Sequence, residues 1–526
     1  MRHGYFAGWT VRWLTAGTIL LCIASGCAKL PDNSALVPTT VISATEQTHL
    51  ATLFADDKKE HPGQSGFYLL DNGLDAFVAR AVLVLAAEKS IDLQYYLYHP
   101  DLVGGLLADL LLQAADRGVR VRLLLDDMGL EGRDINLFTI AQHPNISVRI
   151  FNPFIRGSSR VSQFITRFGS VTRRMHNKSL TIDNQATIVG GRNIGNEYFA
   201  ADPELAFGDM DVLAIGPVVN EISNSFDSYW NNPLSYPVEL ISSQKPDPEA
   251  LERARPLLDA YTKRPEAQQY VQALKNSQLA RELKNDVLPF SWGKAVAVYD
   301  DPEKISAALD AKDLHLATQL NPLVNELSSE FLMLSAYFVP GKEGVDFFKK
   351  LQSQGVQVRI LTNSLASTDV AVVHCGYAKY RKELLRAGVE LYEVAIDALP
   401  AGKKKQQVFG GASKASLHAK SYIFDRQILF IGSFNFDPRS ADQNTELGIV
   451  FDSPELGRKI GKRFDERKST NVYQLRLVPD NYGGEDVEWV RKEGGREVVR
   501  RVEPDTSFFK RLLVSVMALL PIESQL

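Results

Sequence analysis

The sequence predicts an α/β protein of two duplicated domains, each a mixed, mostly parallel sheet covered by helices, packed about a pseudo-twofold axis. Two observations support this fold class. A pattern of five residue types occurs twice at one spacing, once in each half of the 526-residue chain. Strand and helix patterns also follow one another in the same order in both halves. A chain of this length exceeds one average domain, which agrees with two or three.

The repeated pattern begins with a histidine and ends with an asparagine. The first copy contains His176, Lys178, Asp183, Gly190 and Asn193, and the second contains His418, Lys420, Asp425, Gly432 and Asn435. Such a five-point pattern arises by chance at about one position in several million. Two copies in one chain therefore indicate an internal duplication.

Alternating helices and strands extend the duplication beyond this pattern. In the first half we predict helices over 75–89 and 102–117 and strands over 91–98, 119–126 and 147–152. In the second half we predict strands over 330–339, 356–363 and 389–394 and helices over 344–354 and 377–386. Strands that alternate with helices favour parallel pairing, with helices on both faces of the sheet.

The N-terminus is typical of an exported protein. Arg2 and Arg12 precede an apolar run over 13–24, which has the length of a secretory signal. Small residues before Cys27 resemble a lipoprotein cleavage site with Cys27 as the lipidated residue; a plain signal peptide or an uncleaved anchor is the alternative. We therefore expect a membrane-anchored lipoprotein of a bacterial cell envelope that faces the periplasm, in the inner or the outer membrane.

These signals divide the chain into six parts. They are a signal peptide (1–26), a tether (27–62), a first domain (63–245), a helical connector (246–290), a second domain (291–480) and a C-terminal tail (481–526). The tail contains an apolar stretch over 508–522 that is too short to span a bilayer. This stretch either lies in the membrane interface or packs on the core.

Composition excludes several classes of protein. The net charge of −4 gives no overall basic field for nucleic acid. Removal of the signal peptide and lipidation of Cys27 would leave Cys375 as the one free cysteine, so neither a disulfide framework nor a paired-cysteine zinc site is expected.

The duplicated pattern resembles the phospholipase D superfamily, in which each half supplies one motif to a shared active site. The resemblance covers residues from about 66 to 452, and other segments, such as 190–199, are similar to the bacterial cardiolipin synthases. It implies two phospholipase D-like domains with a catalytic set of His176, Lys178, Asp183, His418, Lys420 and Asp425. In this family the first-half histidine is more often the nucleophile, which would make His176 the nucleophile and His418 the acid and base.

Strand geometry supports phosphoryl chemistry at these residues. Histidine and lysine two positions apart point to the same side of a strand, so two such strands at a twofold axis present two histidines and two lysines to one pocket. One histidine can attack phosphorus while the other transfers protons. The lysines, with Asn193 and Asn435 as phosphate-binding donors, would stabilise the developing charge. We therefore expect no metal and no cofactor.

Carboxylates near the motifs have a different predicted role. Asp183 and Asp425 stand at an odd offset from the histidines and should point away from the pocket, where they would orient neighbouring backbone. Family members use a later carboxylate to hold each histidine. The candidates are Glu446 in the second half and Asp211 or Asp209 in the first.

Basic segments without acidic residues precede both motifs, at 150–182 and 398–424, and suit anionic lipid headgroups. The favoured function is a cardiolipin synthase-type phosphatidyltransferase that moves a phosphatidyl group between phospholipids through phospho-histidine. Its partners would be the membrane surface and phospholipid substrates, with phosphatidylglycerol as the first candidate and phosphatidylethanolamine as the second, and no nucleic acid. A hydrolytic phospholipase D is the alternative, followed by a nuclease or a non-catalytic lipid-binding scaffold.

Overall fold

The computed structural model describes residues 29–202, 205–284, 288–396, 414–468 and 471–518. The predicted signal peptide, Cys27 and most of the basic segment at 398–424 lie outside these described residues. Within them, no helix is both long enough and apolar enough to cross a membrane.

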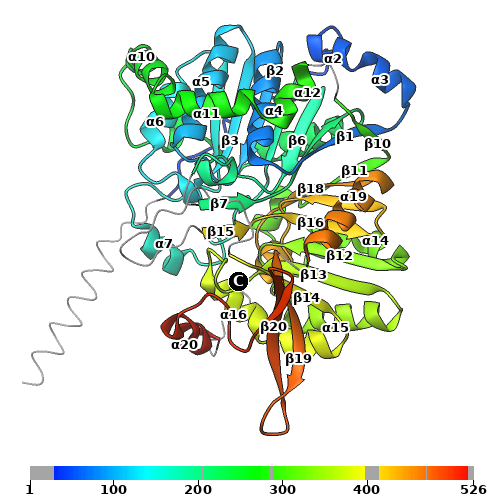
Figure 1. Ribbon diagram of the computed structural model, residues 1–526. Helices are drawn as coiled ribbons and strands as arrows, with labels where there is room; N and C mark the ends of the chain where they lie inside the picture. The colour runs from blue at the N-terminus through cyan, green and yellow to red at the C-terminus, as the bar shows by residue number, and fades with distance from the viewer. Residues whose placement is uncertain (1–28, 203–204, 285–287, 397–413, 469–470, 519–526) are drawn as a thin grey trace, which may run out of the picture.

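Two large sheets form the two halves of the molecule (Figure 1). The strands of the first sheet are β1 (Ser65–Leu70), β2 (Ser90–Tyr95), β3 (Arg120–Asp126), β4 (Ile146–Phe151), β5 (Ser179–Ile182), β6 (Ala186–Gly190), β8 (Asp211–Ile215), β9 (Ser235–Pro237) and β10 (Ser291–Gly293). Those of the second are β11 (Ala295–Tyr299), β12 (Glu330–Ser335), β13 (Gln357–Asn363), β14 (Glu390–Val394), β16 (Lys420–Phe424), β17 (Ile428–Gly432), β18 (Leu447–Asp452), β19 (Val472–Pro479), β20 (Glu485–Glu493) and β21 (Arg496–Arg500). A separate two-stranded sheet pairs β7 (Leu205–Gly208) with β15 (Lys414–Leu417).

Helices follow the strands in both halves. The first half and the connector contain α2 (His49–Leu53), α3 (Ala55–Glu60), α4 (Gly73–Ala86), α5 (Leu102–Asp116), η1 (Asp127–Gly129), α6 (Asp134–Ile140), α7 (Arg160–Thr166), η2 (Asn196–Tyr198), α8 (Val218–Trp230), α9 (Val238–Ile241), α10 (Ala250–Thr262), α11 (Pro265–Lys275) and α12 (Gln278–Lys284). The second half contains η3 (Pro302–Ile305), η4 (Lys312–Leu314), α13 (Leu316–Gln319), α14 (Asn321–Glu326), α15 (Gly341–Ser353), α16 (Ala371–Ala378), α17 (Arg381–Arg386), α18 (Pro438–Asp442), α19 (Pro454–Arg467) and α20 (Phe508–Met517).

The two sheets repeat one topology, which confirms the predicted duplication of an α/β domain. The first has the order β10-β1-β8-β6-β5-β2-β3-β4-β9, and the second has the order β11-β18-β17-β16-β12-β13-β14-β19-β20-β21. Parallel pairing is limited to β2-β3-β4 and to β12-β13-β14, where helices connect successive strands. The sheets are therefore mixed but mostly antiparallel, contrary to the expected parallel majority, because each motif strand continues into a hairpin, β5–β6 or β16–β17.

The inner faces of the two sheets pack against one another. Residues of β1, β6 and β8 share a buried apolar cluster with residues of β16, β17 and β18. At its centre the rings of Phe67 and Phe451 stack with centroids 4.1 Å apart. Helices α4, α5 and α10–α12 cover the outer face of the first sheet. The inner face of each sheet is shared between the opposite sheet and one helix, α8 on the first sheet and α19 on the second, so helices lie on both faces of each sheet as expected.

Several segments belong to a different unit from the one we expected. Residues of the predicted tether pack on the first domain: the Asn33 amide donates to the Ser235 carbonyl at 2.9 Å, and Arg122 donates to the Thr39 carbonyl at 2.9 Å. Strand β10, at the start of the predicted second domain, completes the first sheet. Strands β20 and β21 extend the second sheet into the predicted tail, to Arg500.

Candidate active site

Each motif lies at the start of a β-hairpin whose strands are joined by three residues, 183–185 or 425–427, the first two of which are the central residues of a β-turn. The turn residues Asp183 and Asn184 have φ angles of 50°, and Asp425 and Arg426 have φ angles of 51° and 56°. Positive φ at both central residues defines a type I′ turn, which matches the twist of the flanking strands. The histidines lie at the opposite ends of β5 and β16 from these turns.

The aspartates of the two motifs hold these turns in place. The Asp183 carboxylate accepts backbone N–H groups of Glu88, Lys89 and Ser90 at 2.9, 2.7 and 2.8 Å. Asp425 accepts the equivalent N–H groups of residues 328–330. Each carboxylate therefore fixes its hairpin to the segment before the adjacent antiparallel strand, β2 or β12, which is the backbone-orienting role predicted from its odd offset.

The two halves exchange backbone hydrogen bonds next to each histidine. The His176 N–H donates to the Thr445 carbonyl at 2.8 Å, and the Thr445 N–H donates to the Arg174 carbonyl at 2.9 Å. In the other direction the His418 N–H donates to the Gly208 carbonyl at 2.8 Å, where β15 pairs with β7. Each motif histidine therefore sits on a strand that pairs with the opposite half of the chain.

This exchange gives each histidine a carboxylate from the other half. His176 Nδ1 lies 2.8 Å from Glu446 Oε2, and His418 Nδ1 lies 2.7 Å from Asp209 Oδ2. With Nδ1 held by a carboxylate, Nε2 is the nitrogen of each ring that can face a substrate; Nε2 of His418 also lies 3.2 Å from Lys420 Nζ. Glu446 was among the predicted residues, but its partner is the histidine of the first half.

Asp209, rather than Asp211, is the second carboxylate. Asp211 is buried and bonds Arg80 at 2.8 Å, so it serves the core of the first domain. Strand registers show why: Gly190 pairs with Asp211 and Gly432 pairs with Gly448, which makes Asp209 the counterpart of Glu446. The two aspartates stand two positions apart, so alternation along the strand does not separate them.

Close approach of the strands explains which residue type follows each motif glycine, glycine at position 191 and serine at position 433. A Cβ at Gly191 would lie 2.3 Å from Asp209 Oδ1, so a side chain there would displace the carboxylate that holds His418. The second half has Ser433 at this position, and its hydroxyl donates to Glu446 Oε2 at 2.5 Å. In the first half the space beside the carboxylate must therefore stay empty, whereas in the second half the serine hydroxyl fills that space and donates to the carboxylate.

The lysines and histidines of the two halves form one buried group. Lys178 Nζ donates to the His176 carbonyl at 2.5 Å, and Lys420 Nζ lies 2.9 Å from His418 Nδ1. Burial lowers the pKa of His176 well below its usual value, and the charges of Lys178, Lys420 and His418 lower it further. The charges of Lys420 and His418 thus act on His176 across the boundary between the halves.

The two histidines differ in their electrostatic surroundings. Burial and Lys420 lower the pKa of His418, but Asp209 opposes this shift. Burial favours a raised pKa for Asp209, yet His418 and Lys420 outweigh it and hold that pKa below its usual value. Burial raises the pKa of Glu446 to about 7 and lowers that of Lys178 to about 7. His418 therefore faces an ionised carboxylate, whereas the carboxyl that holds His176 is half-protonated near neutral pH.

Both motif asparagines are buried in this region. The Asn193 side chain accepts the Leu97 N–H at 3.2 Å and donates to the Tyr198 hydroxyl at 2.8 Å. The Asn435 amide oxygen is buried without a hydrogen-bond partner among the described residues. Asn193 is thus held by its own half, and the role of the two asparagines in phosphate binding stays a prediction.

Two further positions support the histidines and were not predicted. Asp126 ends β3 and accepts the N–H of Met175, the residue before His176, at 2.9 Å. Asn363 ends β13 and accepts the N–H of Leu417, the residue before His418, at 2.9 Å. Polar residues at the carboxyl ends of parallel strands were the sequence signal that could have identified both.

Aromatic rings also contact both histidines. The Tyr96 ring packs edge-on against His176 with centroids 4.9 Å apart, and the Tyr198 ring packs in the same way against His418 at 5.1 Å. The aromatic end of the strand over 91–98 was visible in the sequence, but its contact with the motif required the fold. These rings fix the imidazole planes and keep the site apolar around its polar atoms.

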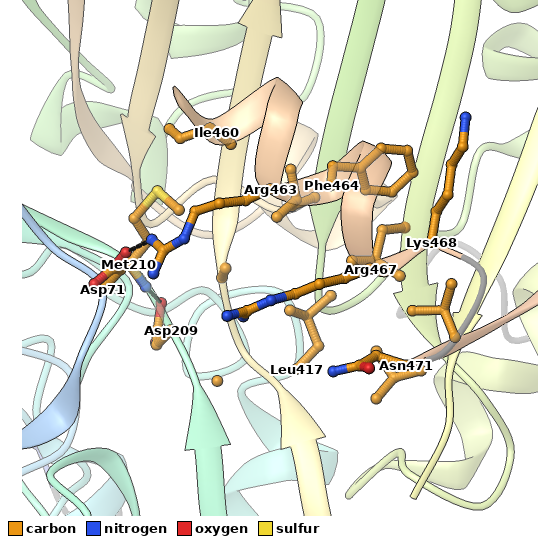
Figure 2. A pocket seen from close by; sticks show the side chains of 16 residues that line it. Asp71, Asp209, Met210, Leu417, Ile460, Arg463, Phe464, Arg467, Lys468 and Asn471 are labelled. Atoms are coloured by element: carbon orange, nitrogen blue, oxygen red, sulfur yellow. Dashed lines mark hydrogen bonds and ion pairs between the residues drawn. The ribbon is translucent and has the colours of Figure 1, made fainter. Parts of the chain in front are cut away.

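A pocket of about 240 Å³ is lined by the residues on either side of the second histidine (Figure 2). Leu417 and Ala419, the neighbours of His418, line it together with Asp209 and Met210. Arg463, Arg467 and Lys468 of α19 and its C-terminal end form a cationic side, where Arg463 pairs with Asp71. The pocket therefore borders the strand segment that positions both His418 and its carboxylate.

The basic residues at 150–182 are largely used inside the protein. Arg156 and Arg160 bond Asp127, and Arg174 bonds Asp126. Arg173 donates to backbone carbonyls, the shortest of these contacts being 2.6 Å to Ala307. The expectation that this segment offers its charge to lipid headgroups was therefore wrong. Asp126 and Asp127, which precede the segment in the sequence, neutralise arginines within it.

One group among the described residues has the composition of a cation site. Ligand atoms of His99, Asp101 and Glu197 lie within 4.8 Å of one another. Asp101 already accepts the N–H groups of Gly104 and Asn196, and Glu197 pairs with His99 at 3.2 Å. These bonds cap α5 and join it to η2, so the group has a structural explanation.

Comparison with known proteins agrees with this site. The family model described as "Cardiolipin synthase, PLD-like domain" matches residues 83–230 and 322–468. The chain is 42% identical over 468 residues to cardiolipin synthase C of Escherichia coli (strain K12), covering 88% of this chain and 97% of that protein. It is 35% identical over 512 residues to an uncharacterised protein of Helicobacter pylori (strain ATCC 700392 / 26695), covering 94% and 97%.

Among solved structures, phosphatidylserine synthase of Haemophilus influenzae Rd KW20 is similar with a TM-score of 0.52 at 12% sequence identity. The similarity covers 81% of this chain and 92% of that chain, and it shows a shared fold. The duplicated domain and the paired motifs define a member of the phospholipase D superfamily. Within that superfamily the chain belongs to the cardiolipin synthase family, whose model matches both halves.

Replacement of Asp183 tests its structural role. Asp183→Ala leaves three backbone N–H groups without their acceptor and should lower the free energy of unfolding by about 3 kcal/mol. Asp183→Asn, which keeps one acceptor oxygen and tolerates positive φ, should lose clearly less. Denaturant unfolding measures both, with Asp56→Ala on exposed α3 as the control. A loss of turnover in the Asn variant without loss of stability would contradict the assignment.

Proposed function

We propose that this protein is a cardiolipin synthase-type phosphatidyltransferase that moves a phosphatidyl group from a donor phospholipid to the free hydroxyl of phosphatidylglycerol. The observation that carries the proposal is the pair of buried histidines, each held at Nδ1 by a carboxylate of the opposite half. Two lysines beside them supply fixed positive charge for an anionic phosphodiester. Similarity to cardiolipin synthase C of Escherichia coli supports the choice of lipid substrates.

The proposed reaction has two displacement steps at phosphorus. Nε2 of His176 attacks the donor phosphorus, the P–O bond to the headgroup alcohol breaks, and His418 gives its proton to the leaving oxygen. The hydroxyl of phosphatidylglycerol then attacks the phosphatidyl-histidine, its proton passes to His418, and the P–N bond breaks. Lys178 and Lys420 stabilise the charge on the non-bridging oxygens in both steps.

Electrostatic asymmetry supports this division of roles. A nucleophilic imidazole must be neutral, and His176 has its pKa lowered by burial and by surrounding cations. A general acid must hold a proton near neutral pH, and Asp209 opposes the lowering of the pKa of His418. Because Asp209 is ionised, it also stabilises the imidazolium that forms when His418 takes a proton.

A lipid mass spectrum tests the reaction. Full-length protein incubated with phosphatidylglycerol vesicles, with and without phosphatidylethanolamine, should produce cardiolipin. His176→Ala and His418→Ala should each lower the rate by about 10³-fold or more, because each step loses an essential group. His49→Ala, on exposed α2, serves as the matched control and should keep the wild-type rate.

The products distinguish the alternatives. Phosphatidic acid in place of cardiolipin would show water as the acceptor and make the protein a hydrolytic phospholipase D. Dependence on phosphatidylethanolamine would identify the donor. Equal activity of wild type and the His176 variant would contradict the proposed site.

The pH dependence of turnover tests the role of Asp209. In Asp209→Asn the pKa of His418 should fall further, since the opposing negative charge of the carboxylate is lost. The alkaline limb of the profile of kcat/KM should then move to lower pH, with activity partly regained on acidification. Glu446→Gln, which removes a half-protonated partner from His176, should leave that limb in place. An unchanged limb in Asp209→Asn would argue against His418 as the acid.

We also propose that Cys27 is lipidated and anchors the protein in the bacterial cell envelope, facing the periplasm. Small residues before this cysteine and the preceding apolar run support the proposal. Globomycin, which blocks lipoprotein signal peptidase, should cause a larger precursor to accumulate, seen by gel migration and by labelling with radioactive palmitate. A Cys27→Ser variant provides the control, and unchanged migration without acyl label would contradict lipidation.

A further inference from the structure

Two short segments, distant in sequence, expose large apolar side chains to solvent. One is α7 with the turn after it, and the other is α20 near the C-terminus. We call them together the apolar rim, which consists of Val161, Ile165, Phe168, Phe508, Phe509, Leu512, Leu513 and Val516. Ile165 is 77% exposed and Phe509 is 78% exposed, which is unusual for side chains that each remove a large apolar area from water when buried.

Each segment is attached to the strand end that supports one histidine. Arg160, the first residue of α7, donates to the carbonyls of Met128 and Asp127, directly after Asp126 at the end of β3. Lys510 of α20 donates to the Leu365 carbonyl at 2.5 Å, two residues after Asn363 at the end of β13. Since Asp126 and Asn363 fix the residues before His176 and His418, the apolar rim is coupled to both sides of the site.

Helix α20 packs on the second half of the chain through one of its sides. Val514, its buried residue, packs with Leu365 and Cys375 of the second half. Just before the helix, Glu503 pairs with His374 at 3.2 Å and with Arg381. The helix is therefore fixed on the protein by one side, while Phe508, Phe509, Leu512, Leu513 and Val516 are directed away from it.

Charge at the apolar rim differs from that of the chain. Neither α7 nor α20 contains an acidic residue, and α20 contains Lys510 and Arg511, whereas the whole chain has a net charge of −4. Figure 1 shows both helices toward the left of the molecule, and α20 packs against α16. Apolar side chains with cations and no acids are complementary to the interface of an anionic bilayer.

We propose that the apolar rim inserts into the interface of a bilayer that contains anionic phospholipid and orients the active site toward the lipid it acts on. The inference rests on the proposed function for the identity of the substrate, but insertion itself is independent of turnover. Two separate anchoring points would fix the orientation of the site as well as its distance from the membrane. This goes beyond a flexible N-terminal anchor, which would set distance alone.

Photo-crosslinking tests the insertion directly. p-Benzoylphenylalanine replaces Ile165, Phe168, Phe509 or Leu513 in the full-length chain, reconstituted in vesicles of phosphatidylglycerol and phosphatidylethanolamine. Leu257 on α10 is the matched control, because it is 72% exposed and lies on a helix of the connector. After illumination, intact-protein mass spectrometry should show adducts with the mass of one phospholipid for both segments, at least tenfold above the control.

Each other outcome overturns the proposal. Absence of lipid adducts from either segment would exclude a two-point contact, and equal adducts at residue 257 would show unspecific labelling. A crosslinked dimer would identify the apolar rim as an interface between copies of this chain. Because the readout is a mass and not a product, it stays informative if the chain proves to act on a different phosphodiester.

A paired activity measurement connects the apolar rim to catalysis. Ile165→Asp combined with Leu513→Asp should lower turnover of vesicle phospholipid at least tenfold. Turnover of a monomeric short-chain phosphatidylglycerol should stay within twofold, since neither residue contacts the histidines. Leu257→Asp should leave both rates unchanged. An equal loss on the monomeric substrate would show a folding defect or a direct role in the site, and no loss on vesicles would refute the orienting function.

Discussion

The exchange of backbone hydrogen bonds between the two halves is the constraint on which the site depends. His176 pairs with Thr445 and His418 pairs with Gly208, and the next residue on each partner strand is the carboxylate that holds the histidine. Neither half contains a complete pair, so neither half alone has the chemistry. The face-to-face packing of the two sheets keeps this exchange in register, and Phe67 and Phe451 stack at that interface.

Much of this arrangement was predictable from local signals. The motif spacing placed histidine and lysine on one side of a strand and directed the aspartates, at odd offset, away from the pocket. The parallel strands β3 and β13 were predicted within one residue at each end, because buried β-branched runs bounded by glycine leave few alternatives. These features are determined by residues that are close together in the sequence, so a single sequence is enough to predict them.

Features that depend on distant partners were not predictable. Asp209 and Asp211 stand two positions apart, so the sequence does not tell which of them holds the histidine. Only the folded structure separates them, because Asp211 pairs with Gly190 between β6 and β8 and forms an ion pair with Arg80. The basic residues at 150–182 seemed available for lipid binding in the sequence, because their partners Asp126 and Asp127 lie outside that segment. The sheets proved mostly antiparallel because alternation of strands and helices predicts the two crossovers of each half but not the hairpins added beside them.

The two halves of the site share one fold but differ in charge. Glu197 and Arg439 stand at the same distance after their motif histidines, yet they have opposite charges. Arg439 lowers the pKa of His176, and the charge of His418 lowers the pKa of Glu197. Opposite charges at equivalent positions add to the difference between Asp209 and Glu446. Divergence at these few positions thus gives the two histidines different electrostatic surroundings without any change in the backbone that the two halves share.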